Sequence, residues 1–345
     1  MRYNPALDGL RAVAIVLVIL FHSDQAIFPG GWIGVDIFFV LSGYLITSIL
    51  ASELMETGAV SLTNFYVRRA LRLTPALLLL ALFQFARSGF SPNGSEIRTA
   101  TLISMAYLEN WNMVFDFRPS PTMGHTWSLA TEEQFYLLWP FALLLVIKRR
   151  PLVWIALAIV AMMADRFAFR GHLRHLIFAL DARPIGLLVG CALALLPVRL
   201  WSRVPAALPF VAMAALLAIA IGLAGADRFL LAGPPVGSLA TAAIIVSAQP
   251  GNTIAALLSL RPAVYIGKIS YGLYLYSSPI FILGEQWAVD APYHLYEIGL
   301  IALIFATAAL SYEFVEKPIL RLKGRFRGGA RAMPLAAAGV SQEAA

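Results

Sequence analysis

Ten apolar runs of 15 to 22 residues recur along the chain, and they constrain its fold more than any other feature. A run near 20 residues can cross the hydrocarbon core of a bilayer as a helix, and lipid cannot satisfy the backbone polar groups of an irregular segment. The sequence is 60% hydrophobic and 13% charged, whereas soluble domains are roughly 45–50% apolar and 25% charged. We therefore predict an all-α, polytopic transmembrane helix bundle of about ten spans. The runs are 10–28, 34–52, 71–87, 131–147, 151–165, 184–198, 207–225, 234–249, 264–285 and 296–315.

The positions of the basic residues predict the orientation of these spans. Short loops rich in Lys and Arg stay in the cytoplasm. If the N-terminus is inside and the polar-interrupted segment 97–115 is not a full span, the basic clusters near residues 68–72, 148–150, 199–203 and 317–331 are all cytoplasmic. We therefore expect cytoplasmic N- and C-termini and a re-entrant or partly buried segment at 97–115. Four arginines of the outer segment 166–183 break the rule.

Composition also predicts the domain organisation. Residues 1–323 read as one membrane domain, and residues 324–345, rich in Arg, Gly and Ala, as a disordered cytoplasmic tail near anionic lipid. The net charge is +7, and the basic residues lie beside apolar spans. This placement fits membrane topology, so we do not expect nucleic acid as a partner. The single cysteine, Cys191, excludes an internal disulfide and reads as a packed hydrophobe.

The first apolar run contains an arginine and a histidine on one helix face. Arg11 and His22 are eleven residues apart, which is close to three helical turns and roughly 16 Å along the axis. Charged or titratable groups are costly in hydrocarbon, so they usually face a bundle interior or a polar cavity. This pair therefore predicts a lined channel.

Two further groups of polar residues lie near the inner ends of spans. Asp36 shares a helix face with Gly43, and the small residues Ser42 and Gly43 permit close helix packing; an interfacial position is the alternative explanation for Asp36. Arg69 and Arg72, next to Arg68, present two guanidinium groups on one face. They favour an anion clamp, because planar guanidinium groups match phosphate oxygens, although a basic cluster that sets topology has the same pattern.

A third group lies at the start of the run 131–147. Ser128 can cap a helix there, and capping explains one of the acids Glu132 and Glu133 but not both. Glu133 and Tyr136 share a face, which predicts a carboxylate and a phenol in the cavity.

Histidines outside the first run give weaker signals. His125 reads as structural. His172 and His175 are spaced as metal ligands can be, but the sequence shows no third ligand, so we predict a solvated loop and no metal.

Six strings, in this order over nearly the whole chain, resemble the acyltransferase-3 family of bacterial membrane O-acyltransferases. The resemblance implies transfer of an acyl group, usually acetyl from acetyl-CoA, to a hydroxyl of an extracytoplasmic glycan or lipid-linked sugar. It also implies a multi-pass protein among the lipids of the bacterial inner (cytoplasmic) membrane. The strings are residues 7–11 with His22, residues 34–47, Arg69-x-x-Arg72 with Pro75, residues 127–136, residues 269–275 and residues 311–318.

The family pattern maps onto named residues with one departure. Its arginine–histidine pair corresponds to Arg11 and His22, and its paired-arginine motif to Arg69 and Arg72. Its late string usually reads Tyr-Leu-Trp-His-x-Pro, whereas this chain has Ser277 where the histidine is common. Serine cannot act as a base near neutral pH.

These observations combine into a mechanistic hypothesis. His22 is the general base, and Glu133 or Asp36 is a catalytic carboxylate near it. Arginines bind the phosphates of the acyl-CoA co-substrate: Arg11, Arg68, Arg69 and Arg72. Supporting roles fall to Asp8, Ser42, Trp127, Ser128, Glu132 and Tyr136. A secondary transporter or flippase is the alternative, because intramembrane Asp, Arg and His also form proton relays.

Overall fold

The computed structural model describes residues 3–118, 120–222, 226–249, 251–285 and 293–326, and within these ranges the chain forms helices and no strands. The fold class is therefore all-helical, as predicted. The α-helices are α1 Pro5–Ser23, α2 Ile33–Thr57, α3 Leu62–Ser88, α4 Gly94–Met105, α5 Glu109–Phe115, α6 Trp127–Val146, α7 Pro151–Ala168, α8 Leu173–Phe178, α9 Ile185–Leu195, α10 Leu208–Ala220, α11 Ala226–Ser247, α12 Thr253–Leu258, α13 Arg261–Glu285, α14 Tyr293–Ser311 and α15 Lys317–Leu320. Shorter helical segments are η1 Gly124–Thr126, η2 Val198–Arg203, the π-helical η3 Tyr312–Glu316 and η4 Arg321–Phe326.

Each of the ten predicted runs falls on a helix, namely α1, α2, α3, α6, α7, α9, α10, α11, α13 and α14. Five helical stretches of the described chain are long and apolar enough to cross a membrane: Pro5–Ser23, Ile33–Thr57, Leu62–Ser88, Pro151–Ala168 and Leu295–Arg325. Three shorter helices are also apolar: Ile185–Leu195, Leu208–Ala220 and Leu231–Ser247. The fold is that of a membrane helix bundle, while the number of spans and the side on which the termini lie stay predictions.

The segment 97–115 is not one helix. It breaks between α4 and α5, where Tyr107 adopts a left-handed φ of 55°. Glu109 and Asn110, which interrupt its apolar pattern, are fully buried. The amide of Gln134 on α6 donates to the Tyr107 carbonyl at 2.7 Å and to the Asn110 side chain at 2.9 Å. The polar residues therefore hold a bend against α6. Their burial fits the expected partly buried segment, while its place relative to the membrane stays a prediction.

The central helices pack very closely where glycines face one another. A Cβ atom at Gly43 of α2 would lie 2.0 Å from the carbonyl oxygen of Leu187 on α9, and one at Gly190 of α9 would lie 2.1 Å from that of Val40. Such small residues let two helix backbones approach within a membrane bundle. Gly58 follows the last residue of α2 as its C-cap, and its left-handed φ of 75° favours glycine.

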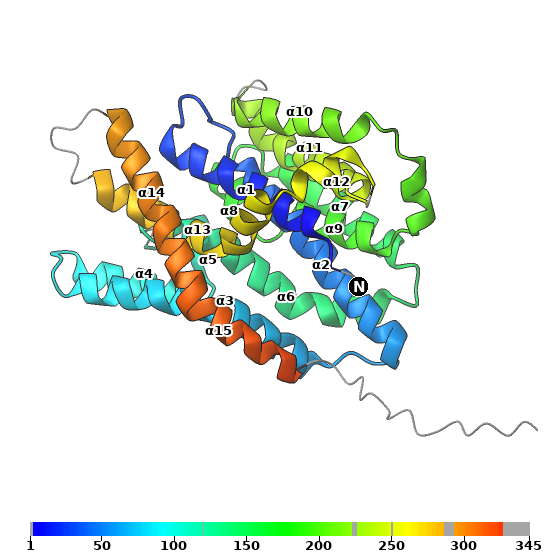
Figure 1. Cartoon of the computed structure of the whole chain (residues 1–345), viewed down its shortest axis with the longest axis horizontal. Coiled ribbons are helices and arrows are strands. Elements are labelled where there is room, and N and C mark those ends of the chain that lie inside the picture. Colours follow the sequence, from blue (N-terminus) through cyan, green and yellow to red (C-terminus); the bar gives the residue numbers. More distant parts are fainter. Residues whose placement is uncertain (1–2, 119, 223–225, 250, 286–292, 327–345) are drawn as a thin grey trace, which may run out of the picture.

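The last helices bring the end of the described chain back to the start of α3. α14, η3 and α15 follow one another as a single rod that crosses α13 and α3 (Figure 1). η4 then extends to Phe326, so ordered structure continues slightly past the predicted boundary at 323. Residues 327–345, most of the predicted tail, lie outside the described residues.

Candidate active site

A cavity of about 530 Å³ lies between α1, α2, α3, α6 and α13, a size within the roughly 300–1,000 Å³ of small-molecule sites. Its wall carries five basic side chains and two acidic ones. The basic residues are Arg11, Arg68, Arg69, Arg72 and Lys323, and the acidic ones are Asp8 and Glu132. All four arginines expected to bind phosphate thus meet in one space, and its net charge suits an anion.

Arg69 is the most firmly held of these cations. Its guanidinium donates to Glu133 at 2.5 and 3.1 Å and lies 3.3 Å from the centre of the Tyr136 ring. Glu133 and Tyr136 do share a helix face, as predicted, but both contact Arg69. Their joint contact fixes the direction in which the guanidinium points.

Arg72 differs from its neighbours because, in the described part of the chain, no carboxylate lies within ion-pair distance of it. Arg11 pairs with Asp8 at 3.6 Å, and Arg68 pairs with Glu53 at 3.6 Å. Arg11 and Arg69 lie close enough to Arg72 to repel its charge. A guanidinium group that faces two others across a cavity favours a bound polyanion.

A hydrogen-bonded pair of hydroxyls, one from a serine and one from a tyrosine, lies in the wall of the cavity. Ser128, near the start of α6, and Tyr274 of α13 both line the cavity, and their hydroxyls are 2.6 Å apart. The Tyr274 hydroxyl also donates to the backbone carbonyl of His125. Ser277, the departure from the family pattern, is buried and donates to the Tyr274 carbonyl at 3.1 Å. Ser277 thus contacts the backbone of a tyrosine that lines the cavity.

His22 is absent from the described residues that line the cavity, and it lies close enough to His125 to affect its charge. Its Nδ1 is 2.8 Å from the carbonyl oxygen of Val18, which can only accept a hydrogen bond. The hydrogen of the neutral ring is therefore on Nδ1, and the lone pair is on Nε2. That is the nitrogen a general base would use.

His125 is a second buried imidazole that the sequence analysis assigned to structure. Its Nε2 donates to the Leu275 carbonyl at 3.1 Å, and its buried Nδ1 has no hydrogen-bond partner in the described structure. Burial, reinforced by the nearby His22, lowers the pKa of His125 to about 3. The ring is neutral at physiological pH and leaves a free acceptor beside Tyr274, whose ring centre is 5.6 Å away.

Asp36 does not reach the cavity. Its carboxylate forms a bidentate ion pair with Arg183, both side chains are fully buried, and the Arg183 guanidinium lies 4.5 Å from the centre of the Trp32 ring. Glu133 likewise contacts Arg69. The two carboxylates expected beside His22 therefore need correction, because each is bound by an arginine instead: Glu133 by Arg69 of α3, and Asp36 by Arg183 of the loop before α9. The Asp36 pair also gives Arg183 a structural role that does not depend on membrane topology.

Most of the remaining predicted residues line the cavity, but Trp127 does not. Asp8, Ser42, Ser128, Glu132 and Tyr136 line the cavity, and the Ser42 hydroxyl donates to Glu132 at 3.0 Å. Trp127 packs instead against Phe39 and Phe178, with ring centres 6.3 and 5.3 Å away. Cys191 is fully buried against α2, as predicted.

Several cavity residues were not predicted from the sequence, among them Tyr3, Tyr274 and Lys323. Tyr274 lies within one of the family strings and was a possible signal. Lys323 follows the last helix in a generally basic stretch, and nothing local distinguishes it from its neighbours.

Comparison with known proteins identifies the family of the chain. Residues 4–313 match the family described as an acyltransferase domain. The chain is 34% identical over 354 residues to O-acetyltransferase OatA of Staphylococcus aureus strain NCTC 8325, covering 94% of this chain and 58% of that protein. It is 33% identical over 350 residues to SAS0844 of S. aureus strain MSSA476, which carries an O-acetyltransferase name given provisionally, covering 92% and 57%.

The chain thus spans a little over half the length of these curated relatives. Comparison with solved structures gives no match. The match to the family includes the four arginines of the cavity and the first-helix histidine. The chain belongs to the acyltransferase-3 family.

Proposed function

We propose that the protein is an O-acetyltransferase of the bacterial inner membrane. It takes an acetyl group from acetyl-CoA on the cytoplasmic side and transfers it to a hydroxyl of an extracytoplasmic or lipid-linked glycan. The acetyl group is favoured because the relative OatA is named an O-acetyltransferase.

The observation that carries this proposal is the arginine cavity. Coenzyme A bears several phosphate charges, and guanidinium groups bind phosphate through short, charge-assisted hydrogen bonds. Arg72, which has no carboxylate partner in the described chain, is the arginine best placed to bind a phosphate group of coenzyme A. Arg69 is held in a fixed direction by Glu133 and Tyr136, so it offers a preorganised second contact.

The acetyl thioester then extends from the arginines toward His22. Arg11 and His22 are separated by roughly 16 Å along α1. The Ser128–Tyr274 hydrogen bond lies in the cavity wall next to His125, which neighbours His22. The donor arm reaches His22 when Tyr274 releases Ser128 and swings aside. Nε2 of His22 takes the proton of the acceptor hydroxyl, whose oxygen attacks the thioester carbonyl. The C–S bond breaks, and the proton passes to the coenzyme A thiolate.

Transfer from radiolabelled acetyl-CoA in purified, detergent-solubilised protein tests this reaction. Comparison of glycans from cells with and without the protein, by mass, supplies the acceptor to add. His22→Ala removes the base and is expected to lower the rate by about 10²–10⁴-fold. His172→Ala, in an exposed loop, is the matched control and keeps the wild-type rate.

Two results would contradict the proposal. Near-normal transfer by His22→Ala would remove this residue from the mechanism. Substrate flux in vesicles without acetyl-CoA consumption would favour the transporter alternative.

A further inference from the structure

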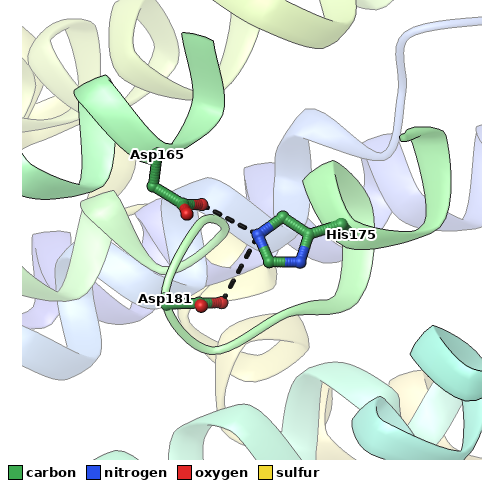
Figure 2. Close-up of side chains that lie close together, drawn as sticks. All are labelled: Asp165, His175 and Asp181. Atoms are coloured by element: carbon green, nitrogen blue, oxygen red, sulfur yellow. Dashed lines mark hydrogen bonds and ion pairs between the residues drawn. The ribbon is translucent and has the colours of Figure 1, made fainter. Parts of the chain in front are cut away.

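A separate cluster of side chains lies where α7, α8 and the loop before α9 meet. Figure 2 shows the carboxylates of Asp165 and Asp181 directed at the same ring nitrogen of His175. This nitrogen, Nε2, is 2.8 Å from Oδ2 of Asp165 and 3.6 Å from Oδ1 of Asp181. The three ligand atoms all lie within 4.8 Å of one another. None of the three residues lines the arginine cavity described above.

A hydrogen bond from His175 accounts for the position of only one of the two carboxylates. A ring nitrogen carries one hydrogen in the plane of the ring, so Nε2 can serve one acceptor well. Asp165 takes that position, and the second carboxylate, Asp181, faces the same atom without a hydrogen to accept. With a neutral imidazole the cluster carries a charge of −2, which a divalent cation neutralises.

The distances suit a small transition-metal ion. Zn²⁺ binds histidine nitrogen and carboxylate oxygen at about 2.0–2.2 Å, which separates neighbouring ligands of a tetrahedral site by roughly 3.4 Å. The two distances from Nε2, 2.8 and 3.6 Å, bracket that separation. The Asp181 side chain is 60% exposed and follows α8 in a loop, so its carboxylate can move inward to complete the set.

We propose that Asp165, His175 and Asp181 bind one divalent transition-metal cation, for which Zn²⁺ is the best match. An imidazole ligand favours zinc and its neighbours over Mg²⁺ and Ca²⁺, which prefer all-oxygen ligands. Water fills the fourth position. The sequence showed His175 but no third ligand, because the carboxylates stand ten residues before it and six after it, and only the turn between α7 and α9 brings them together.

The bound ion holds in place the segment from Leu176 to Ala182, which leads to Arg183 of the buried ion pair. NH1 of Arg166 donates to the carbonyls of Leu176 and Ala182, at 3.1 and 3.0 Å, and so already ties both ends of this segment to α7. Phe178 within it packs on Trp127, and Arg183 directly after it pairs with Asp36. A metal at Asp181 therefore fixes the position from which Arg183 reaches α2.

Metal binding is measured on the full chain, purified in detergent with an affinity tag that contains no histidine. The protein is stripped with a chelator, equilibrated with Zn²⁺ and freed of excess, and bound zinc is counted by mass spectrometry. Wild type is expected to hold about one ion per chain. Asp181→Asn and His175→Ala are expected to weaken binding by about tenfold or more, whereas the control His172→Ala binds like wild type.

Asp181→Asn keeps the test decisive, because a residue this exposed can be changed without unfolding the protein. Hydrogen exchange adds a second measurement: Zn²⁺ is expected to slow exchange in residues 173–183 of wild type and not of Asp181→Asn. Substoichiometric zinc in wild type, equal affinity in Asp181→Asn, or displacement of Zn²⁺ by equimolar Mg²⁺ or Ca²⁺ would each overturn the assignment. Loss of binding in His172→Ala would overturn it as well.

Discussion

Removal of one partner of the Asp36–Arg183 ion pair is expected to destabilise the bundle strongly. Both side chains are fully buried and bonded in a bidentate manner. Leaving one buried charge without its partner costs about 3–5 kcal/mol. At roughly 2 °C per kcal/mol for a large chain, Asp36→Asn or Arg183→Gln is expected to lower the midpoint of thermal unfolding by about 6–10 °C. The double variant removes both charges and regains most of that loss.

The chain supplies its own probe for this measurement. Cys191 is the only cysteine in the sequence, and it is fully buried between α9 and α2. A thiol-reactive dye therefore reports when this interface opens. Wild type, the two single variants and the double variant are heated in the same detergent, and acetyl transfer is measured on each below its midpoint.

Two outcomes would refute the reasoning. Single variants that unfold at the wild-type midpoint would show that the pair contributes no stability. A double variant that is as unstable as the singles would show that the unpaired charge is not the cause of the loss. If the double variant regains stability but not activity, the charge of Asp36 or of Arg183 has a role beyond stabilising the bundle.

The other predictions concern donor binding, pH and packing. Arg72→Met is expected to weaken acetyl-CoA binding about 10–100-fold, the value of a charged hydrogen bond, in a binding titration; unchanged affinity would contradict the phosphate role. Burial raises the pKa of Glu109 to about 7, above its unfolded value near 4.3. Between these two pKa values the folded protein keeps a proton on Glu109 that the unfolded chain releases. Stability is therefore expected to fall by about 3 kcal/mol as pH rises from about 4.5 to 7. In Glu109→Gln the midpoint of thermal unfolding should depend less on pH over this range. Gly43→Val is expected to prevent folding, because a Cβ there meets a backbone oxygen at 2.0 Å; dye reactivity of Cys191 at room temperature measures this, and a protected thiol would contradict it.

Much of the fold could be predicted because hydropathy and helix periodicity are local. The ten apolar runs became ten helices, and the break in 97–115 followed from Glu109 and its polar neighbours. Same-face relations within one helix also held: Glu133 and Tyr136 lie together on Arg69. Arg69 and Arg72 line one cavity.

Partners between helices could not be predicted in this way. Asp36 was expected near His22, yet it pairs with Arg183, 147 positions along the chain. Lys323 enters the arginine cavity because the last helices return to α3. Neither relation leaves a local pattern in the sequence.

The sequence by itself determined which segments are helical, which side chains share a helix face and which family the motifs resemble, because 3.6-residue periodicity and hydrophobicity act over a few turns. The tertiary structure alone decided which charge neutralises which, that Tyr274 of α13 meets Ser128 of α6 in the cavity wall, and that two aspartates meet His175. These pairings depend on how closely and at what angle helices cross, and contacts such as Gly43 on Leu187 set that geometry.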